Sequence, residues 1–188
     1  MNTDDLVRAL AADVPAVRRH ALEARIAAGV VAGAAATGIF LTFFAGFRPD
    51  LDSAVLGFPF WMKWVYTISL GLIAVAATVR LARPEPLSLG WLWAVLLPVL
   101  PLAGLAAGEL QRAPNQDWMR LWLGGSWLVC PWYVLVFALP IFAGLIWALR
   151  RLAPTRLRAA GAMAGAASGA WGAVLYCLHC REASALFV

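Results

Sequence analysis

Residues 128–149 read LVCPWYVLVFALPIFAGLIWAL, a run that contains no charged side chain. A helix crosses the ~30 Å hydrocarbon core of a bilayer in roughly 20 residues, so this run is long enough to span a membrane. Similar runs recur along the chain and predict five spans, at residues 26–47, 60–81, 87–108, 128–149 and 159–180. None alternates as a barrel strand does, and a backbone in lipid must satisfy its own polar groups. The predicted fold class is therefore all-α, a polytopic membrane helical bundle.

The composition of the whole chain also favours lipid as its solvent. Of 188 residues, 63% are hydrophobic and 13% are charged, whereas a soluble domain is about half apolar and about a quarter charged. The net charge of +5 comes from arginines that flank apolar runs and form no basic stripe. We therefore expect membrane lipid, and no nucleic acid, among the partners.

Basic residues in the connecting segments predict the orientation, because short cytoplasmic loops carry an excess of Lys and Arg. If the N-terminus is cytoplasmic, twice as many Lys and Arg residues lie on the inner side of the membrane as on the outer side. The inner set is Arg8, Arg18, Arg19, Arg25, Arg80, Arg83, Arg150, Arg151, Arg156 and Arg158; the outer set is Arg48, Lys63, Arg112, Arg120 and Arg181. We expect the C-terminus of this chain to lie outside, and the short connections to make successive helices neighbours.

Residues 1–25 are the largest polar segment on the predicted inner side. Asn2 or Thr3 can cap a helix, and Asp4 and Asp5 would then complement its dipole. Leu6 and Leu10 share one face of this helix, which Pro15 ends. The helix could lie on the membrane or on loops of its own bundle. Its acidic character favours instead a basic protein partner, because an anionic bilayer surface prefers a basic helix.

The three cysteines, Cys130, Cys177 and Cys180, lie near the predicted outer ends of the last two spans. A rise of about 1.5 Å per residue places them at nearly one level. Facing thiols could form a disulfide, or thiolates and His179 could bind a soft metal ion. A site with all four needs a frayed helix end, because His179 and Cys180 point about 100° apart on a helix. Alternatively, the cysteines are small buried hydrophobic residues.

Glycines recur at the small-xxx-small spacing that lets helix backbones approach closely. We expect most of them to pack within the bundle. The alternative is a homodimer seam on the last span. The spacing occurs at Gly29 and Gly33, at Gly104 and Gly108, and at Gly161, Gly165 and Gly169.

Several segments carry a family resemblance. The opening TDDLVRALAAD at residues 3–13, followed by PAVRR at 15–19, resembles the NrsF family, negative regulators of extracytoplasmic-function sigma factors. The segments FRPDL at 47–51, SWLVC at 126–130 and LHC at 178–180 are similar to that family too. The resemblance runs in order along nearly the whole chain.

This resemblance implies a bacterial inner-membrane anti-sigma factor without a cofactor. Residues 1–25 would be the cytosolic sigma-binding segment, with Asp4, Asp5, Leu6 and Leu10 in contact with the partner, and residues 26–188 the transmembrane bundle. Cys130 and Cys180 would sense metal or redox stress. The family is expected to have six spans, and its sixth would begin near residues 185–187, where this chain ends.

Two other functions are compatible with parts of the sequence. Cys177 and Cys180 form a C-x-x-C motif, which is typical of membrane disulfide–quinone oxidoreductases, but that electron relay needs four cysteines and this chain has three. A transporter would need charges within its spans, and Lys63, at a span boundary, is the candidate here. We therefore expect a regulator and not an enzyme.

Overall fold

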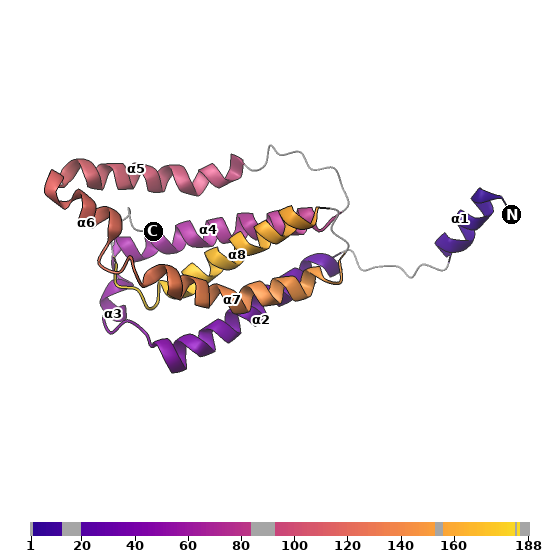
Figure 1. The fold of residues 1–188 in the computed structure, drawn as a ribbon, viewed down its shortest axis with the longest axis horizontal. Coiled ribbons are helices and arrows are strands. Elements are labelled where there is room, and N and C mark those ends of the chain that lie inside the picture. The colour runs from indigo at the N-terminus through magenta and orange to yellow at the C-terminus, as the bar shows by residue number, and fades with distance from the viewer. Residues whose placement is uncertain (1, 13–19, 84–92, 153–155, 183, 185–188) are drawn as a thin grey trace.

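The computed structural model describes residues 2–12, 20–83, 93–152, 156–182 and 184, and the regular elements of these residues are all helices. This confirms the predicted all-α class. Five helices are long and run back and forth (Figure 1). They are α2 (Ala21–Phe40), which η1 (Leu41–Ala45) extends as a π-helix, α4 (Phe58–Leu81), α5 (Leu96–Arg112), α7 (Cys130–Leu149) and α8 (Leu157–Tyr176). The shorter elements are α1 (Thr3–Ala12), α3 (Leu51–Ala54), η3 (Asn115–Asp117) and α6 (Trp118–Leu123).

Four of the described helices are long and apolar enough to cross a membrane, which corrects the predicted count of five. They cover Ala21–Ala45, Phe58–Leu81, Trp93–Arg112 and Cys130–Leu149. The fifth predicted span corresponds to α8, whose 20 residues are rich in alanine and glycine and therefore only weakly apolar. Many α8 side chains are buried by neighbouring helices, so this helix relies on packing more than on lipid contact. The predicted start of the third span, residues 87–92, lies outside the described residues.

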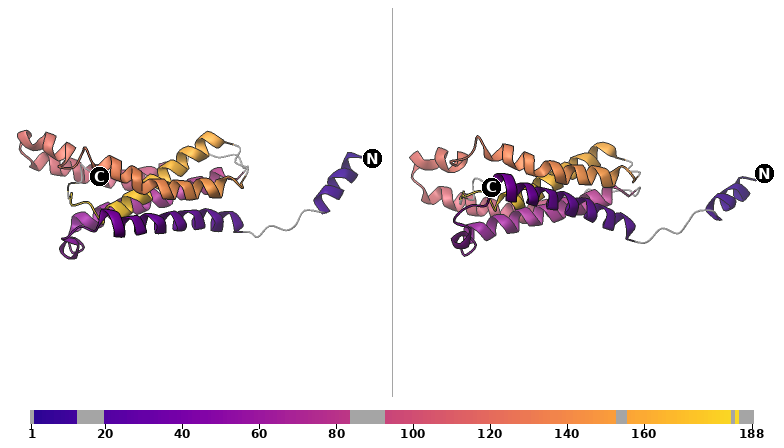
Figure 2. Two further views of the ribbon diagram at one scale, coloured as in Figure 1. Left: turned by 60° about the horizontal axis from the view of Figure 1, so that its bottom comes forward. Right: turned by 90° about the horizontal axis from the view of Figure 1, so that it is seen from below.

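The helices do not all pack in chain order, contrary to the sequence prediction. The main contacts of α2 are with α7, although α4 follows α2 in the chain. α8 packs against both α4 and α7, so the prediction that the last two spans are neighbours is confirmed (Figure 2). The core residues Ile26, Ile141 and Leu145 fill the interface of α2 with α7 and are fully buried.

Close backbone approach explains why α2 selects α7. A Cβ atom added to Gly29 would lie 2.5 Å from the carbonyl oxygen of Gly144, and the hydroxyl oxygen of Thr37 lies 2.9 Å from the carbonyl oxygen of Phe137. Small residues and interhelical hydrogen bonds are the usual means of joining helices in lipid. The expected packing role is therefore confirmed for Gly29 and for Gly33, whose added Cβ would meet the backbone of Ile141.

The other glycine repeats contradict the expected packing role. A Cβ added at any of these positions would meet no atom within 4 Å, so no neighbouring helix backbone approaches them closely. They are Gly104, Gly108, Gly161, Gly165 and Gly169.

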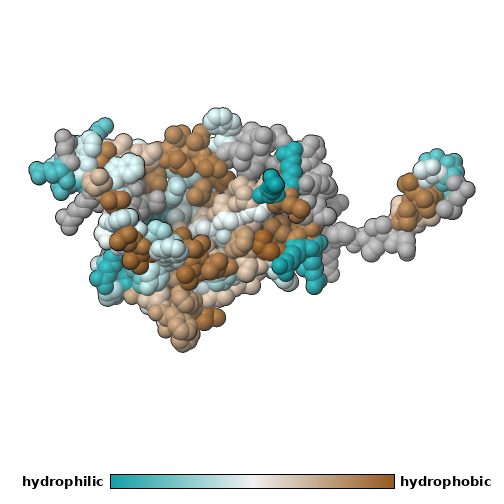
Figure 3. Space-filling model, viewed as in Figure 1, coloured by the Kyte–Doolittle hydropathy of each residue, from teal (hydrophilic) through white to brown (hydrophobic). Residues whose placement is uncertain are grey.

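The helix α5 lies at the margin of the bundle. Its principal helix contact is with α4, and it contains no buried residue. Figure 3 shows apolar surface along the helices and hydrophilic groups gathered at the two ends of the molecule. We call the end with Arg25, Arg83 and Arg150 the arginine end, and the end with Cys130 and Cys180 the thiol end.

The helix α1 forms where the sequence predicts an amphipathic helix. The carbonyl of Asn2 accepts hydrogen bonds from the N–H groups of Asp5 and Leu6, and Asp4 and Asp5 occupy the first turn. Every residue of α1 is exposed, and Figure 1 shows the helix apart from the bundle. Its apolar face therefore has no partner within the described residues.

Candidate functional site

The thiols of Cys130 and Cys180 meet at the thiol end. Cys130 is the first residue of α7 and is 5% exposed, while Cys180 lies in the turn that follows α8. Their sulfur atoms are 3.9 Å apart, so a movement of about 2 Å would bring them to disulfide bonding distance. The hydroxyl of Tyr176 lies 2.7 Å from the Cys130 sulfur. The structure thus brings together the two cysteines that the family resemblance singles out.

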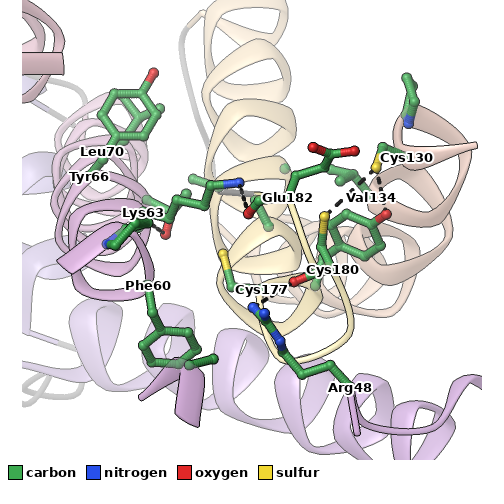
Figure 4. A pocket seen from close by; sticks show the side chains of 18 of the residues that line it. Arg48, Phe60, Lys63, Tyr66, Leu70, Cys130, Val134, Cys177, Cys180 and Glu182 are labelled. Atoms are coloured by element: carbon green, nitrogen blue, oxygen red, sulfur yellow. Dashed lines mark hydrogen bonds between the residues drawn. The ribbon is translucent and has the colours of Figure 1, made fainter. Parts of the chain in front are cut away.

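The other two candidate ligands, Cys177 and His179, have different surroundings. Figure 4 shows the Cys177 sulfur apart from the pair, on the side of the pocket nearer to Phe60. The helix α8 ends at Tyr176, and backbone hydrogen bonds continue through Cys180, so the fraying that a four-ligand site needs is not seen in these residues. The Nδ1 atom of His179 donates a hydrogen bond to the carbonyl of Gly46, at 2.9 Å. Among the described residues, no group of three or more His, Cys, Asp or Glu side chains is placed to hold a metal ion.

The first connection of the bundle holds the turn that carries Cys180. The Arg48 guanidinium donates from Nη1 to the carbonyl of Cys180 at 3.0 Å, and the backbone N–H of Arg48 donates to the carbonyl of Leu178 at 3.0 Å. Its Nε and Nη2 atoms donate to the two carboxylate oxygens of Asp50, at 3.0 and 2.7 Å. This two-point hydrogen bond lowers the pKa of Asp50 to about 2, so Asp50 is ionised across the physiological pH range.

A second set of contacts joins the same turn to the start of α7. One carboxylate oxygen of Glu182 accepts hydrogen bonds from the N–H of Gly125, at 2.7 Å, and from the hydroxyl of Ser126, at 3.2 Å. The ammonium of Lys63, a side chain that is nearly buried, donates to the carbonyl of Glu182 at 2.7 Å. Lys63 is therefore partnered at the thiol end and provides no evidence for a transport path.

A pocket of about 750 Å³ opens beside the thiols, between α4, α7 and α8. Its walls combine aromatic and aliphatic side chains with a few charged ones, and all three cysteines line it (Figure 4). Sequence analysis did not identify Arg48, Tyr176 or Glu182 as site residues, and it considered Lys63 only as a candidate for a transporter. The signals available for this site were the lysine at the edge of an apolar span and the family resemblance of residues 47–51, since the contacts themselves join segments far apart in the chain.

The predicted partner-binding residues form a second, separate site on α1. Leu6 and Leu10 are 42% and 64% exposed, which is high for leucine side chains of a folded protein. Asp5 lies 3.9 Å from Arg8 on the same helix. The structure therefore leaves the apolar face of α1 available for a partner.

Comparison with known proteins identifies the family. The model of the family described as "NrsF: Negative regulator of sigma F" matches residues 10–188. The chain belongs to the NrsF family. No solved structure matches it significantly.

Two curated members of the NrsF family align with the full length of this chain. The "Probable anti-sigma-F factor NrsF" of Azospira oryzae is 36% identical over 189 residues, which is 88% of its own length. The "Anti-sigma-F factor NrsF" of Caulobacter vibrioides is 39% identical over 191 residues, again 88% of its own length. NrsF membership places the chain among anti-sigma factors, which are regulatory proteins and not enzymes, and so removes the oxidoreductase alternative.

Proposed function

We propose that this protein is a membrane-bound anti-sigma factor that sequesters an extracytoplasmic-function sigma factor through residues 1–25. Four helices of membrane-spanning length and composition support the membrane location, and the names of the relatives support the sigma-factor partner. The observation that carries the binding mode is the fully exposed helix α1 with its unpartnered leucines. A helix of 10 residues is marginally stable alone, so burial of Leu6 and Leu10 on a partner would stabilise it.

The basic residues at the arginine end support a cytoplasmic position for α1. Arg25, Arg83 and Arg150 lie at the end of the bundle where α2 begins, and short cytoplasmic loops are enriched in such residues. In this orientation, in a bacterial inner membrane, the thiol end faces the periplasm, where disulfides persist.

We further propose that Cys130 and Cys180 form the sensor. In the redox form of the signal, an oxidant such as a peroxide accepts two electrons and two protons from the thiols. A sulfur–sulfur bond forms, and hydrogen peroxide is reduced to two waters, or an alkyl hydroperoxide to an alcohol and one water. In the metal form, the same two thiolates bind a soft metal ion, with Cys177 and His179 as further candidate ligands. The distance of 3.9 Å between the two sulfurs supports both forms.

The bundle offers a direct route from this pair to α1. The turn that carries Cys180 contacts residues 46–50 through Arg48 and Gly46, and these residues continue into α2. The opposite end of α2 leads to the sigma-binding segment. A movement of the Cys180 turn that displaces α2 would change the affinity for the sigma factor. Coupling between two sites is typically about 1–3 kcal/mol, which is about 5–150-fold in affinity.

The binding proposal is tested by co-purification with a peptide of residues 1–25 and with the full chain. We expect the parent forms to retain a sigma factor. We expect Leu6→Asp combined with Leu10→Asp to abolish retention, because two charges on the apolar face make its burial unfavourable. Ala12→Asp is the matched control, since Ala12 lies on the opposite face of α1. Equal retention of the sigma factor by the double variant would refute the proposed interface.

A further inference from the structure

The separation of the two thiols depends on residues 177–180, a turn that backbone hydrogen bonds attach to the last turn of α8. Cys180 lies four residues beyond the end of α8. Its N–H is bonded to the carbonyl of Tyr176, at 2.9 Å, and beyond it the chain leaves the helical path. Because helix ends fray readily, contacts from outside the turn add to these bonds in fixing the position of the Cys180 sulfur.

Besides the hydrogen bond of His179 to Gly46, two side chains supply such contacts from opposite sides. We propose that Arg48 and Glu182 are positioning residues of the thiol pair, which hold Cys180 and Cys130 at reacting distance. This inference rests on the proposed sensor role of the pair and names the residues that tune it.

Arg48 acts on Cys180 directly. Its guanidinium is held in place by the two-point hydrogen bond to Asp50 and is 11% exposed. From this fixed position it donates to the carbonyl of Cys180, while its backbone N–H donates to Leu178. A planar, rigid guanidinium that is anchored at two points orients its third contact well. Figure 4 shows Arg48 reaching toward Cys180 from below the turn.

Glu182 acts on the segment that carries Cys130. Its carboxylate binds Gly125 and Ser126, and the carbonyl of Ser126 accepts the N–H of Cys130 at 2.9 Å. The ammonium of Lys63 holds Glu182 from the other side through the backbone carbonyl. One residue thus links the turn after α8 to the first residue of α7, across more than 50 positions of sequence.

Pre-organisation of this kind raises the effective concentration of one thiol at the other. When the bond forms, each thiol loses one proton and one electron. Oxidised glutathione accepts the two electrons and the two protons, and is released as two molecules of reduced glutathione. A pair held at short distance forms its disulfide at a more reducing potential than a mobile pair. Loss of either contact therefore lowers the equilibrium fraction of disulfide in a given redox buffer.

The experiment uses the full chain, purified in detergent, with Cys177→Ser to leave one thiol pair. The protein is equilibrated in glutathione buffers of graded redox potential, and the Cys130–Cys180 disulfide is measured by mass after alkylation. We expect Arg48→Met and Glu182→Ala to lower the effective concentration about tenfold each, since each loses a charged hydrogen bond. A tenfold loss corresponds to a shift of about 30 mV in reduction potential.

Three further variants separate positioning from a general loss of structure. Glu182→Gln keeps the accepting oxygen and is expected to restore the parent potential. Arg112→Met, at the same end of the bundle, removes a side chain with no described hydrogen bond to residues 177–182 and is expected to leave the potential unchanged. Asp50→Asn changes a side chain that is 47% exposed, and is expected to shift the reduction potential in the same direction as Arg48→Met. This variant replaces Arg48→Met in the test if Arg48→Met does not fold.

The inference is overturned if the reduction potential is the same as the parent's in the Glu182→Ala variant and also in the separate Arg48→Met or Asp50→Asn variant. The assay contains no sigma factor, so its outcome is independent of partner binding. If the parent pair oxidises as expected and oxidation does not release the sigma factor, the redox form of the proposed sensor fails while the positioning role stands.

Discussion

At the scale of single residues, neighbours in sequence are not the partners in space. Cys177 and Cys180 form a C-x-x-C motif, yet the sulfur contact of this region joins Cys180 to Cys130. The motif spacing places its two side chains on different sides of the turn, with Cys177 toward the side of the pocket near Phe60. Cys130 in turn has Tyr176 as a hydrogen-bonding partner. The geometry therefore favours a sensing role for one pair and a packing role for Cys177.

This difference predicts separate effects of the cysteine substitutions. We expect Cys130→Ser combined with Cys180→Ser to blunt the release of the sigma factor by thiol-reactive metals and oxidants, because neither a disulfide nor a dithiolate site can form. The measurement is the fraction of sigma factor retained on the purified protein after exposure. Cys177→Ser is the control and should respond like the parent. A normal response in the double variant would contradict the sensor role.

At the scale of elements, the packing of helices depends on which glycines face another backbone. Gly29 and Gly33 of α2 contact α7, whereas Gly38 on the same helix has open space beside it. Glycine within a helix costs about 1 kcal/mol relative to alanine. That cost is offset at Gly29 by the close approach of α2 and α7, and no such approach exists at Gly38.

Two alanine substitutions on α2 should therefore have opposite effects. Gly29→Ala places a methyl group 2.5 Å from the carbonyl oxygen of Gly144, and such overpacking typically costs about 1–3 kcal/mol. Gly38→Ala meets no atom and should leave stability unchanged or raise it slightly. Thermal unfolding in detergent, followed by circular dichroism, measures both. An unchanged midpoint for Gly29→Ala would show that α2 and α7 are less closely packed than described.

At the scale of the whole molecule, α8 packs on α4 and α7 but leaves its glycine repeat without a close neighbour. A Cβ added to Gly161, Gly165 or Gly169 would meet nothing within 4 Å, and Gly169 lines the pocket between α4, α7 and α8. A seam between two copies, the second use that the sequence predicts for the repeat, therefore has open space at Gly161 and Gly165. We retain the homodimer as a proposal on this ground.

The homodimer proposal is tested by a bulky substitution within the glycine repeat of α8. We expect Gly165→Leu to reduce cross-linked dimer in native membranes, because a large side chain prevents close approach of the two α8 backbones. Gly38→Leu, on a different helix, is the control. The same amount of dimer in both variants would exclude this seam.

The orientation of the molecule gives a further prediction. In a background with the three cysteines replaced by serine, Asn2→Cys should resist a membrane-impermeant maleimide applied to intact cells, and react after the membrane is opened. A cysteine in place of Ser53, in α3 near the thiol end, should react in intact cells. Labelling of Asn2→Cys from outside would reverse the proposed topology and exclude cytoplasmic sigma binding by α1.

Local properties of the sequence were sufficient to predict the helical class, most span positions and the N-terminal helix. Span length and amphipathic periodicity depend on consecutive residues, because each helix satisfies its own backbone hydrogen bonds wherever it lies. The observed bounds of α4 and α7 differ from the predicted ones by only two residues at the start. The family resemblance added the pair Cys130 and Cys180, which spacing alone left open among three thiols.

The tertiary structure alone decided which helices meet and what holds the thiols. The pairing of α2 with α7, and the contacts of Arg48 and Glu182 with the turn after α8 and the start of α7, all join distant segments. Such contacts depend on shape and close approach between surfaces that are equally apolar in lipid, so hydrophobic pattern carries no information about them. For this protein, the sequence determined which segments are helices, and the packing determined where two of its cysteines meet.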